Sequence, residues 1–293
     1  MPDSSIHCCV TSPPYWGLRD YGVEGQLGLE KTPEEYTAKM IELFREVRRV
    51  LRDDGTLWLN LGDSYQSSNS PQVAQTKDIG TSREAVDKRP PRVPWLKPKD
   101  LVGIPWRVAF ALQSDGWYLR SDIIWHKPNP MPESVTDRPT KAHEYIFLMS
   151  KSERYYYDAN AITEKSVMPA GTAGTWRGNV DFKLPGGGPR FAKPNLGGSI
   201  DGTRNKRSVW TVATRPFPEA HFATFPPDLI KPCILAGCPE GGIVLDPFMG
   251  TGTTAVVCAN LGRNYIGIEL NPEYIHIANE RIKQATRQER LFL

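Results

Sequence analysis

The chain has 293 residues, of which 39% are hydrophobic and 24% charged, and its formal net charge is +3. These values are typical of a soluble globular protein with one large domain, and they exclude a chain that is strongly basic along its whole length. There is no signal peptide and no apolar run long enough to span a bilayer, so we expect no contact with a membrane. The five cysteines have apolar neighbours, which predicts buried free thiols in a reducing compartment.

The first predicted element is a buried strand over residues 6–10, and the run Thr11-Ser12-Pro13-Pro14-Tyr15-Trp16 follows it. Prolines donate no backbone hydrogen bond and disfavour helix at the preceding residue, so the strand stops and its end is stiff. The serine hydroxyl, the carbonyl oxygens and the two aromatic rings form acceptors beside a stacking surface. That combination suits a flat ligand with an amino group, such as a flipped-out nucleobase, although a plain strand-ending turn fits as well.

A helix and a second strand follow. Thr32 is the expected N-cap, Pro33 takes the first helical position and Glu35 completes a capping box. Apolar residues then recur at helical spacing, residues 53–55 end the helix, and residues 56–61 form a strand. This strand–helix–strand order predicts an α/β fold with a doubly wound, mostly parallel sheet.

Two irregular tracts interrupt the regular pattern. Residues 64–100 are polar and then rich in proline and basic residues, which predicts an inserted loop. Residues 160–208 are rich in glycine and basic residues, which is typical either of a disordered linker or of a loop that faces nucleic acid. Between the tracts we expect a helix over 101–114, strands over 117–125 and 143–150, and an antiparallel partner strand at Tyr155–Tyr157.

Regular structure returns after residue 208 and carries a second motif. We expect helices over 226–236 and 252–261, strands over 243–246 and 264–269, and a terminal helix from Pro272. The run from Asp246 to Thr254 joins a strand to a helix, and its glycines allow the backbone to turn tightly and approach a ligand. Glu269 ends the next strand, where a carboxylate binds ribose hydroxyls. These features indicate an adenosine-type cofactor, with a dinucleotide-binding dehydrogenase as the alternative.

Taken together, the two motifs resemble those of the amino-group DNA methyltransferases. The resemblance rests on Ser12-Pro13-Pro14-Tyr15, on Asp246-Pro247-Phe248-x-Gly250-x-Gly252-Thr253-Thr254, and on the segment from His221 to Pro226. Their order is that of the permuted beta group of this family: catalytic motif, target-recognition region, S-adenosyl-L-methionine motif. It implies a circularly permuted Rossmann-like domain, with a catalytic half at 1–160, a target-recognition region at 161–208 and a cofactor-binding half at 209–293.

The resemblance also implies a role for individual residues. The expected catalytic residues are Ser12, Pro13, Pro14 and Tyr15. The expected cofactor-binding residues are Thr11, His221, Phe225, Asp246, Pro247, Phe248, Gly250, Gly252, Thr253, Thr254 and Glu269. The expected DNA-binding residues come from the residues themselves: an aromatic side chain beside the first motif, two polar side chains after a strand end, and the basic residues of the second tract. They are Trp16, Lys127, Asn129, Arg177, Arg190, Arg204, Lys206 and Arg207. For Lys127 and Asn129 a purely polar loop is an equally good interpretation.

The implied reaction is methyl transfer from S-adenosyl-L-methionine to the amino group of a base in double-stranded DNA. Serine at the first motif position resembles the cytosine-N4 enzymes, whereas adenine-N6 enzymes more often carry Asp or Asn, so cytosine is favoured and adenine stays open. An RNA or protein amide methyltransferase and a DNA-binding module without turnover are further alternatives. Cys233 after Pro232 would suit ring-carbon methylation of cytosine, but helical spacing explains it more simply.

Some expectations concern the chain's surroundings. Members of this family usually carry an acidic residue before the catalytic strand, near the adenine of the cofactor, and the segment before Ile6 is too short for it. We therefore expect either weaker cofactor binding or a truncated start. The chain is expected to be cytoplasmic and encoded by a bacterium or a phage. A homodimer and a separate cognate restriction endonuclease stay open as partners.

Overall fold

The computed structural model describes residues 1–18, 20–66, 93–166, 202–214 and 225–290. The chain divides into two compact units, one of residues 1–157 and 208–293 and a smaller one of residues 158–207. The smaller unit holds a 3-10 turn, Asn160–Ile162, and β5 (Glu164–Lys165) paired antiparallel with β6 (Thr203–Arg204). It contains the predicted target-recognition region apart from its last residue, but 167–201 lie outside the described residues.

The larger unit is an α/β structure. Its strands are β1 (Ile6–Thr11), β2 (Leu51–Leu61), β3 (Tyr118–His126), β4 (His143–Ser150), β7 (Val209–Thr211), β8 (Ile243–Asp246) and β9 (Asn264–Gly267). Its helices are α1 (Pro33–Val50), α2 (Ile104–Ser114), α3 (Pro227–Gly237), α4 (Thr253–Asn260) and α5 (Pro272–Arg290). Among the described residues, no helix is both long and apolar enough to cross a membrane.

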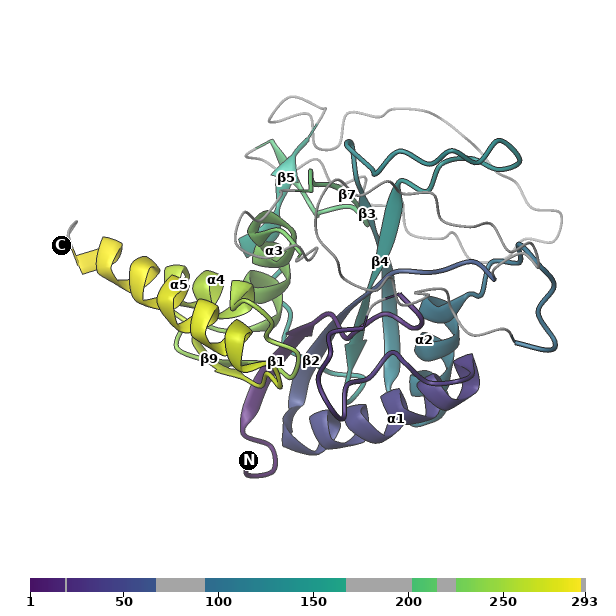
Figure 1. Ribbon diagram of the computed structural model, residues 1–293. Coiled ribbons are helices and arrows are strands. Elements are labelled where there is room, and N and C mark those ends of the chain that lie inside the picture. The colour runs from purple at the N-terminus through teal and green to yellow at the C-terminus, as the bar shows by residue number, and fades with distance from the viewer. Residues whose placement is uncertain (19, 67–92, 167–201, 215–224, 291–293) are drawn as a thin grey trace, which may run out of the picture. The chain divides into compact units, whose positions relative to one another are not determined.

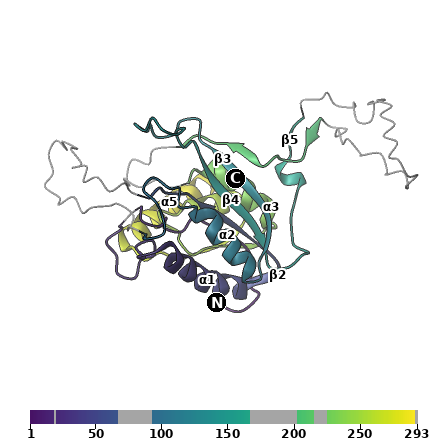
Figure 2. The same cartoon turned by 90° about the vertical axis from the view of Figure 1, so that its right-hand side faces the viewer.

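These strands form one sheet in the order β7-β3-β4-β2-β1-β8-β9. Neighbouring strands run parallel except at β4, which is antiparallel to both β2 and β3. Helices α1 and α2 lie on one face of the sheet, and α3, α4 and α5 lie on the other (Figures 1 and 2). The predicted doubly wound, mostly parallel sheet is confirmed.

Strand β1 lies inside the sheet, between β2 and β8, and positions the two motifs. It pairs with β2 on one side and with β8 on the other, where Cys9 lies opposite Leu245. Because parallel strands end at the same edge, Thr11 at the end of β1 comes beside Asp246 at the end of β8. Residues 235 positions apart in the sequence therefore meet at one edge of the sheet, where α/β proteins bind their ligands.

Helix α1 begins as its sequence predicts. The Thr32 hydroxyl accepts a hydrogen bond from the Glu35 N–H at 3.1 Å, and the Glu35 carboxylate accepts one from the Lys31 N–H at 3.0 Å. Glu35 thus binds the N–H of the residue before the N-cap, and not the N–H of Thr32 itself as in a capping box. The apolar face of α1 is buried against the sheet through Tyr36, Met40, Phe44, Val47 and Val50.

One predicted boundary and one predicted strand are wrong. Helix α1 ends at Val50 and β2 begins at Leu51, because Leu51 pairs with Ile6 of β1 instead of continuing the helix. Residues 155–157 do not form a strand beside β4, because β2 and β3 already occupy both edges of that strand. The Tyr157 ring instead stacks on Trp58, with ring centres 6.3 Å apart.

The cysteines and the first irregular tract can be compared with their predictions in part. All five cysteines are buried free thiols, as predicted, and Cys233 is buried within α3. The ends of the predicted insertion 64–100 are fastened to each other, since the Val93 N–H donates to the Gln66 side chain at 3.2 Å. Residues 67–92 of this tract lie outside the described residues.

Candidate active site

The end of β1 opens into a pocket of about 710 Å³. Ser12, Pro13, Pro14 and Tyr15 line one side of it, and the segment from Pro247 to Gly250 lines another. The Pro14 carbonyl accepts a hydrogen bond from the Tyr36 hydroxyl at 2.9 Å, which fixes the proline pair on α1. The structure therefore brings the Ser12–Tyr15 motif and the glycine motif to one cavity.

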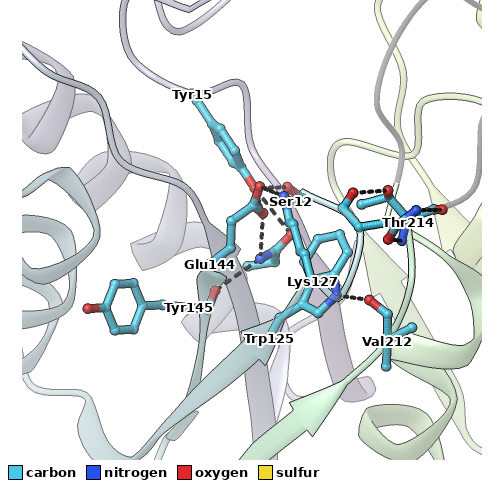
Figure 3. Close-up of polar contacts among 10 residues, drawn as sticks. Ser12, Tyr15, Trp125, Lys127, Glu144, Tyr145, Val212 and Thr214 are labelled. Carbon is cyan, nitrogen blue, oxygen red and sulfur yellow. Dashed lines mark hydrogen bonds and ion pairs between the residues drawn. The ribbon is translucent and has the colours of Figure 1, made fainter. Parts of the chain in front are cut away.

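Close packing and hydrogen bonds fix the Tyr15 ring. A Cβ atom added at Gly62 would lie 2.4 Å from Tyr15 Cε2, so the ring occupies space that only a glycine leaves free. The Tyr15 hydroxyl lies 2.7 Å from Glu144 Oε2, 3.2 Å from Asn60 Oδ1 and 3.5 Å from Ser12 Oγ (Figure 3). Burial and the Glu144 carboxylate raise the pKa of the phenol well above its ordinary value. The phenol is therefore neutral, and it donates to Glu144.

Glu144 connects this ring to the opposite wall of the pocket. Its carboxylate forms an ion pair with Lys127, and both side chains are less than one-fifth exposed. The Lys127 ammonium lies 4.3 Å from the centre of the Trp125 ring, and the Trp125 indole N–H donates to the Val212 carbonyl at 2.8 Å (Figure 3). The cation is thus placed over an aromatic face and against a carboxylate, both of which favour it.

Sequence reasoning missed Asn60 and Glu144. Asn60 is 4% exposed, and its amide donates to the Tyr145 carbonyl at 3.0 Å, so it ties β2 to β4 beside the pocket. A polar side chain at the end of an otherwise apolar strand is the signal that could have indicated it. For Glu144 the sequence gives a weaker indication. It is a single acidic residue near the start of a strand, and its side-chain partner Tyr15 is distant in the sequence.

Asp246 holds the two motifs together from behind the pocket wall. Its carboxylate accepts hydrogen bonds from the hydroxyls of Thr11 and Thr254, each at 2.6 Å, and from the Phe248 N–H at 3.0 Å. None of these three side chains, Asp246, Thr11 or Thr254, lines the pocket. They lock β1, β8 and α4 together, which gives them a positional role beside the predicted cofactor site.

The ionisation of Asp246 gives a testable pH dependence. Burial raises the pKa of this carboxyl to about 6, although three donors partly offset the effect. The folded chain therefore binds the proton more tightly than the unfolded chain, whose carboxyl titrates near pH 4. We expect the free energy of unfolding of the wild type, relative to Asp246→Asn, to be highest below about pH 4, to fall by up to about 3 kcal/mol as the pH rises to 6, and then to stay level.

Urea unfolding of both proteins at several pH values between 4 and 7 measures this difference, and the subtraction removes the other carboxyl groups that the two proteins share. A difference that rises with pH would show that the three donors outweigh burial.

Gly250 and Gly252 have different surroundings. Both adopt positive φ angles, +53° and +83°, which L side chains rarely adopt. A Cβ atom at Gly250 would meet only the Phe248 carbonyl oxygen, at 4.0 Å, whereas one at Gly252 would lie 2.8 Å from the Cβ of Ala278 on α5. Gly250 thus faces the open pocket, and Gly252 allows α5 to pack closely.

Glu269 lies beside this loop. Its carboxylate accepts hydrogen bonds from the N–H groups of Gly250 and Asn271, both at 2.8 Å. A carboxylate has about four acceptor positions, so two N–H donors leave capacity for further donors. The side chain lines the pocket, as the predicted binding of a ribose would need.

The other predicted residues are distributed as follows. Phe225, Thr253 and Lys127 also line the pocket. The Asn129 amide is held by the main chain of Thr214, to which it donates at 3.1 Å and from which it accepts at 3.0 Å. Outside the described residues lie His221, Arg177 and Arg190.

Trp16, one of the predicted DNA contacts, is buried. Its side chain is 1% exposed and its indole N–H donates to the Glu30 carbonyl at 2.9 Å, so no face of the ring is open to a base. In the smaller unit, Arg204 and Arg207 both pair with Glu164, and Lys206 lies between them in the sequence. That single carboxylate partly neutralises the basic cluster.

Known proteins resemble this chain along nearly its whole length. The sequence matches the family described as DNA methylase (N6_N4_Mtase) over residues 6–280. It is 51% identical over 283 residues to the Type II methyltransferase M.XycI of Xanthomonas campestris pv. cyanopsidis, covering 97% of this chain and 83% of that protein. It is 50% identical to M.Cfr9I of Citrobacter freundii, with the same coverage of both chains.

Solved structures share the fold. The cytosine-N4-specific PvuII DNA methyltransferase superposes with a TM-score of 0.63 at 17% identity, over 98% of this chain and 86% of that one. The complex of M1.HpyAVI with S-adenosyl-L-methionine (SAM) superposes with a TM-score of 0.51 at 19% identity, over 95% and 89%. From the family match and the close relatives we conclude that the chain belongs to the N6/N4 DNA methylases, the enzymes that methylate amino groups of bases in DNA.

Proposed function

We propose that this enzyme transfers the methyl group of S-adenosyl-L-methionine to N4 of a cytosine flipped out of double-stranded DNA. The observation that carries the proposal is that the Ser12–Tyr15 motif and the Pro247–Gly250 loop line a single pocket. A volume of about 710 Å³ is within the usual range for pockets that bind small molecules. One cavity can therefore take both the cofactor and the target base.

The chemistry of one side of the pocket fits the cofactor. Glu269 supplies a carboxylate for the ribose hydroxyls, and Gly250 lets a ligand approach the backbone. Apolar side chains suited to an adenine ring line the same side, among them Phe225, Phe248, Ile268 and Leu270. When bound, the cofactor supplies a methyl group activated by a positively charged sulfur.

The other side of the pocket fits the target base. Ser12 Oγ and the Pro13 carbonyl accept the two hydrogens of the amino group, which turns the nitrogen lone pair away from the ring and toward the methyl carbon. The Tyr15 ring stacks on the base, and Glu144 and Asn60 hold that ring by its hydroxyl. Positioning accounts for most of the rate enhancement, and the two acceptors stabilise the positive charge that develops on nitrogen.

The preference for cytosine rests on Ser12, since the motif with serine resembles that of the cytosine-N4 enzymes. DNA from cells that express the chain should be digested to nucleosides and analysed by mass spectrometry. We expect N4-methylcytosine, and we expect its amount to fall strongly with the Ser12→Ala variant. N6-methyladenine instead would overturn the choice of base while keeping the amino-group mechanism. The absence of both modified bases would contradict the proposed function.

We also propose that the enzyme methylates one short sequence, as the modification enzyme of a Type II system. Two relatives at about half identity carry the name Type II methyltransferase. Single-molecule sequencing of the methylated DNA should then show modification confined to one recognition sequence. Modification scattered over unrelated sequences would count against this assignment.

The two motif glycines give a paired prediction. Gly252→Ala should lower the free energy of unfolding by about 3 kcal/mol, because the new methyl group collides with Ala278 at an unfavourable backbone angle. Gly250→Ala should cost stability only about 1 kcal/mol but raise the Kd for the cofactor at least about tenfold, because its methyl group enters the pocket. Thermal unfolding and calorimetric titration separate the two effects, and equal loss of stability in both variants would contradict this assignment.

A further inference from the structure

The loop between β3 and β4, residues 127–142, carries an unusually exposed apolar side chain. Met131 is 87% exposed, and no other large apolar side chain in the described ranges exceeds 59%. In Figure 2 this loop extends beyond the end of the sheet, at the top of the view. A single exposed apolar side chain is common on protein surfaces. What distinguishes Met131 is the extent of its exposure together with the way its loop is held.

The loop is stiff around Met131. Pro130 and Pro132 flank it and restrict the backbone on both sides. On the side toward β3, the Asn129 side chain holds the main chain of Thr214 by two hydrogen bonds, at 3.0 and 3.1 Å. Met131 is therefore held in water by a rigid support and is not the tip of a loose loop.

The side of the loop toward β4 is fastened as well. Arg138 pairs with Glu133 at 2.6 Å, and its guanidinium lies 3.8 Å from the centre of the Tyr65 ring. Asp137 pairs with Lys99 at 2.6 Å. These contacts connect the loop to the segment that leads into α2.

The loop that carries Met131 starts from the wall of the active-site pocket. Lys127 and Thr214 both line that pocket, and Asn129 is joined to Thr214. The Cα atoms of Met131 and Asn129 are two residues apart, hence at most about 7.6 Å from each other. A duplex whose target base enters the pocket therefore has its base stack within reach of this loop.

We propose that Met131 enters the base stack at the position that the flipped base leaves. The inference rests on the proposed function, since it assumes a base drawn from a duplex into the pocket. Flipping breaks stacking and pairing, and apolar side chains, methionine among them, insert between bases in proteins that distort DNA. Its unbranched thioether chain adapts to an irregular gap. Met131 would thus stabilise the flipped state without touching the reacting atoms, as a positioning residue.

Single-turnover methylation of two duplexes tests the proposal. Both contain the recognition sequence mapped by sequencing, one with the normal partner opposite the target base and the other with an abasic site there. The variants are Met131→Ala, Met131→Leu, and Val135→Ala as a control on the same loop, where Val135 is 39% exposed. Cofactor affinity and melting temperature should be the same in all of them.

We expect Met131→Ala to methylate the paired duplex about tenfold more slowly than the wild type but the abasic duplex within about twofold of it, because a base without a partner flips at lower cost. Met131→Leu and Val135→Ala should match the wild type on both. An unchanged rate of Met131→Ala on the paired duplex, or an equal loss on both duplexes, would overturn the proposal. Failure of the proposed function itself would appear differently, as a wild type that methylates neither duplex.

Discussion

Replacing Ser12 by alanine should lower kcat about 100-fold, which corresponds to about 2.7 kcal/mol of transition-state stabilisation. The hydroxyl lies at the end of β1 in the shared pocket, and it is one of the two acceptors that we assign to the target amino group. Its hydrogen-bonded neighbour is the Tyr15 hydroxyl at 3.5 Å, a long contact whose loss should cost the fold little. The melting temperature and the Kd for the cofactor should therefore stay near those of the wild type.

Steady-state methylation with labelled cofactor, together with calorimetric titration, checks this prediction. Ser12→Thr is a matched control, because it keeps the hydroxyl and should retain much more activity than Ser12→Ala. A Ser12→Ala enzyme with near wild-type kcat would exclude the serine as an acceptor for the amino group.

The second large effect is expected at Glu144. Glu144→Ala removes the 2.7 Å partner of the Tyr15 hydroxyl and leaves Lys127 as a largely buried cation without its carboxylate. We expect kcat to fall about tenfold and the free energy of unfolding to fall by about 2 kcal/mol, less than for a fully buried pair because both side chains keep some exposure. Glu144→Gln keeps an acceptor for Tyr15 and should lose less kcat than Glu144→Ala.

A double-mutant cycle identifies the reason for the loss of activity. If Glu144 acts by holding the Tyr15 ring, then Tyr15→Phe removes the same hydrogen bond, and the two losses in kcat should not add in Tyr15→Phe/Glu144→Ala. Losses that multiply would mean that Glu144 acts on the reaction independently of Tyr15. The effect of the unpaired charge on stability is measured separately, in the double variant Lys127→Met/Glu144→Gln. Because it has no buried cation without a partner, its free energy of unfolding should be higher than that of Glu144→Ala.

The motifs that the sequence shows are those that act locally. Consecutive prolines end a strand and glycines allow a tight turn whatever surrounds them, so Ser12–Tyr15 and the Gly250 loop can be found without a structure. Their meeting at one edge follows from the parallel order of β1 and β8. The fold class and most element bounds were predictable for the same reason, as hydrophobic spacing and caps are local.

What escaped prediction depends on register between distant strands. Asn60 and Glu144 meet Tyr15 only because β2 and β4 pair antiparallel, with Leu61 opposite Tyr145. The burial of Trp16 escaped prediction for a related reason: an aromatic ring after a strand suits stacking, but the chain around Glu30 covers it. The hydrogen bonds of Asp246 to the threonines behind the loop could not be predicted either, since they join residues from distant parts of the chain. Composition and spacing contain no information on which side of a pocket wall a residue lies.

A crystal structure of the enzyme with the demethylated cofactor and a duplex that contains its recognition sequence tests the central claim most directly. We predict a cytosine outside the helix, with its amino nitrogen at about 2.7–3.2 Å from both Ser12 Oγ and the Pro13 carbonyl oxygen, and with Tyr15 against its ring. The cofactor ribose should contact Glu269. A base held in the pocket with its amino group away from Ser12, or a cofactor bound outside the Gly250 loop, would contradict the account.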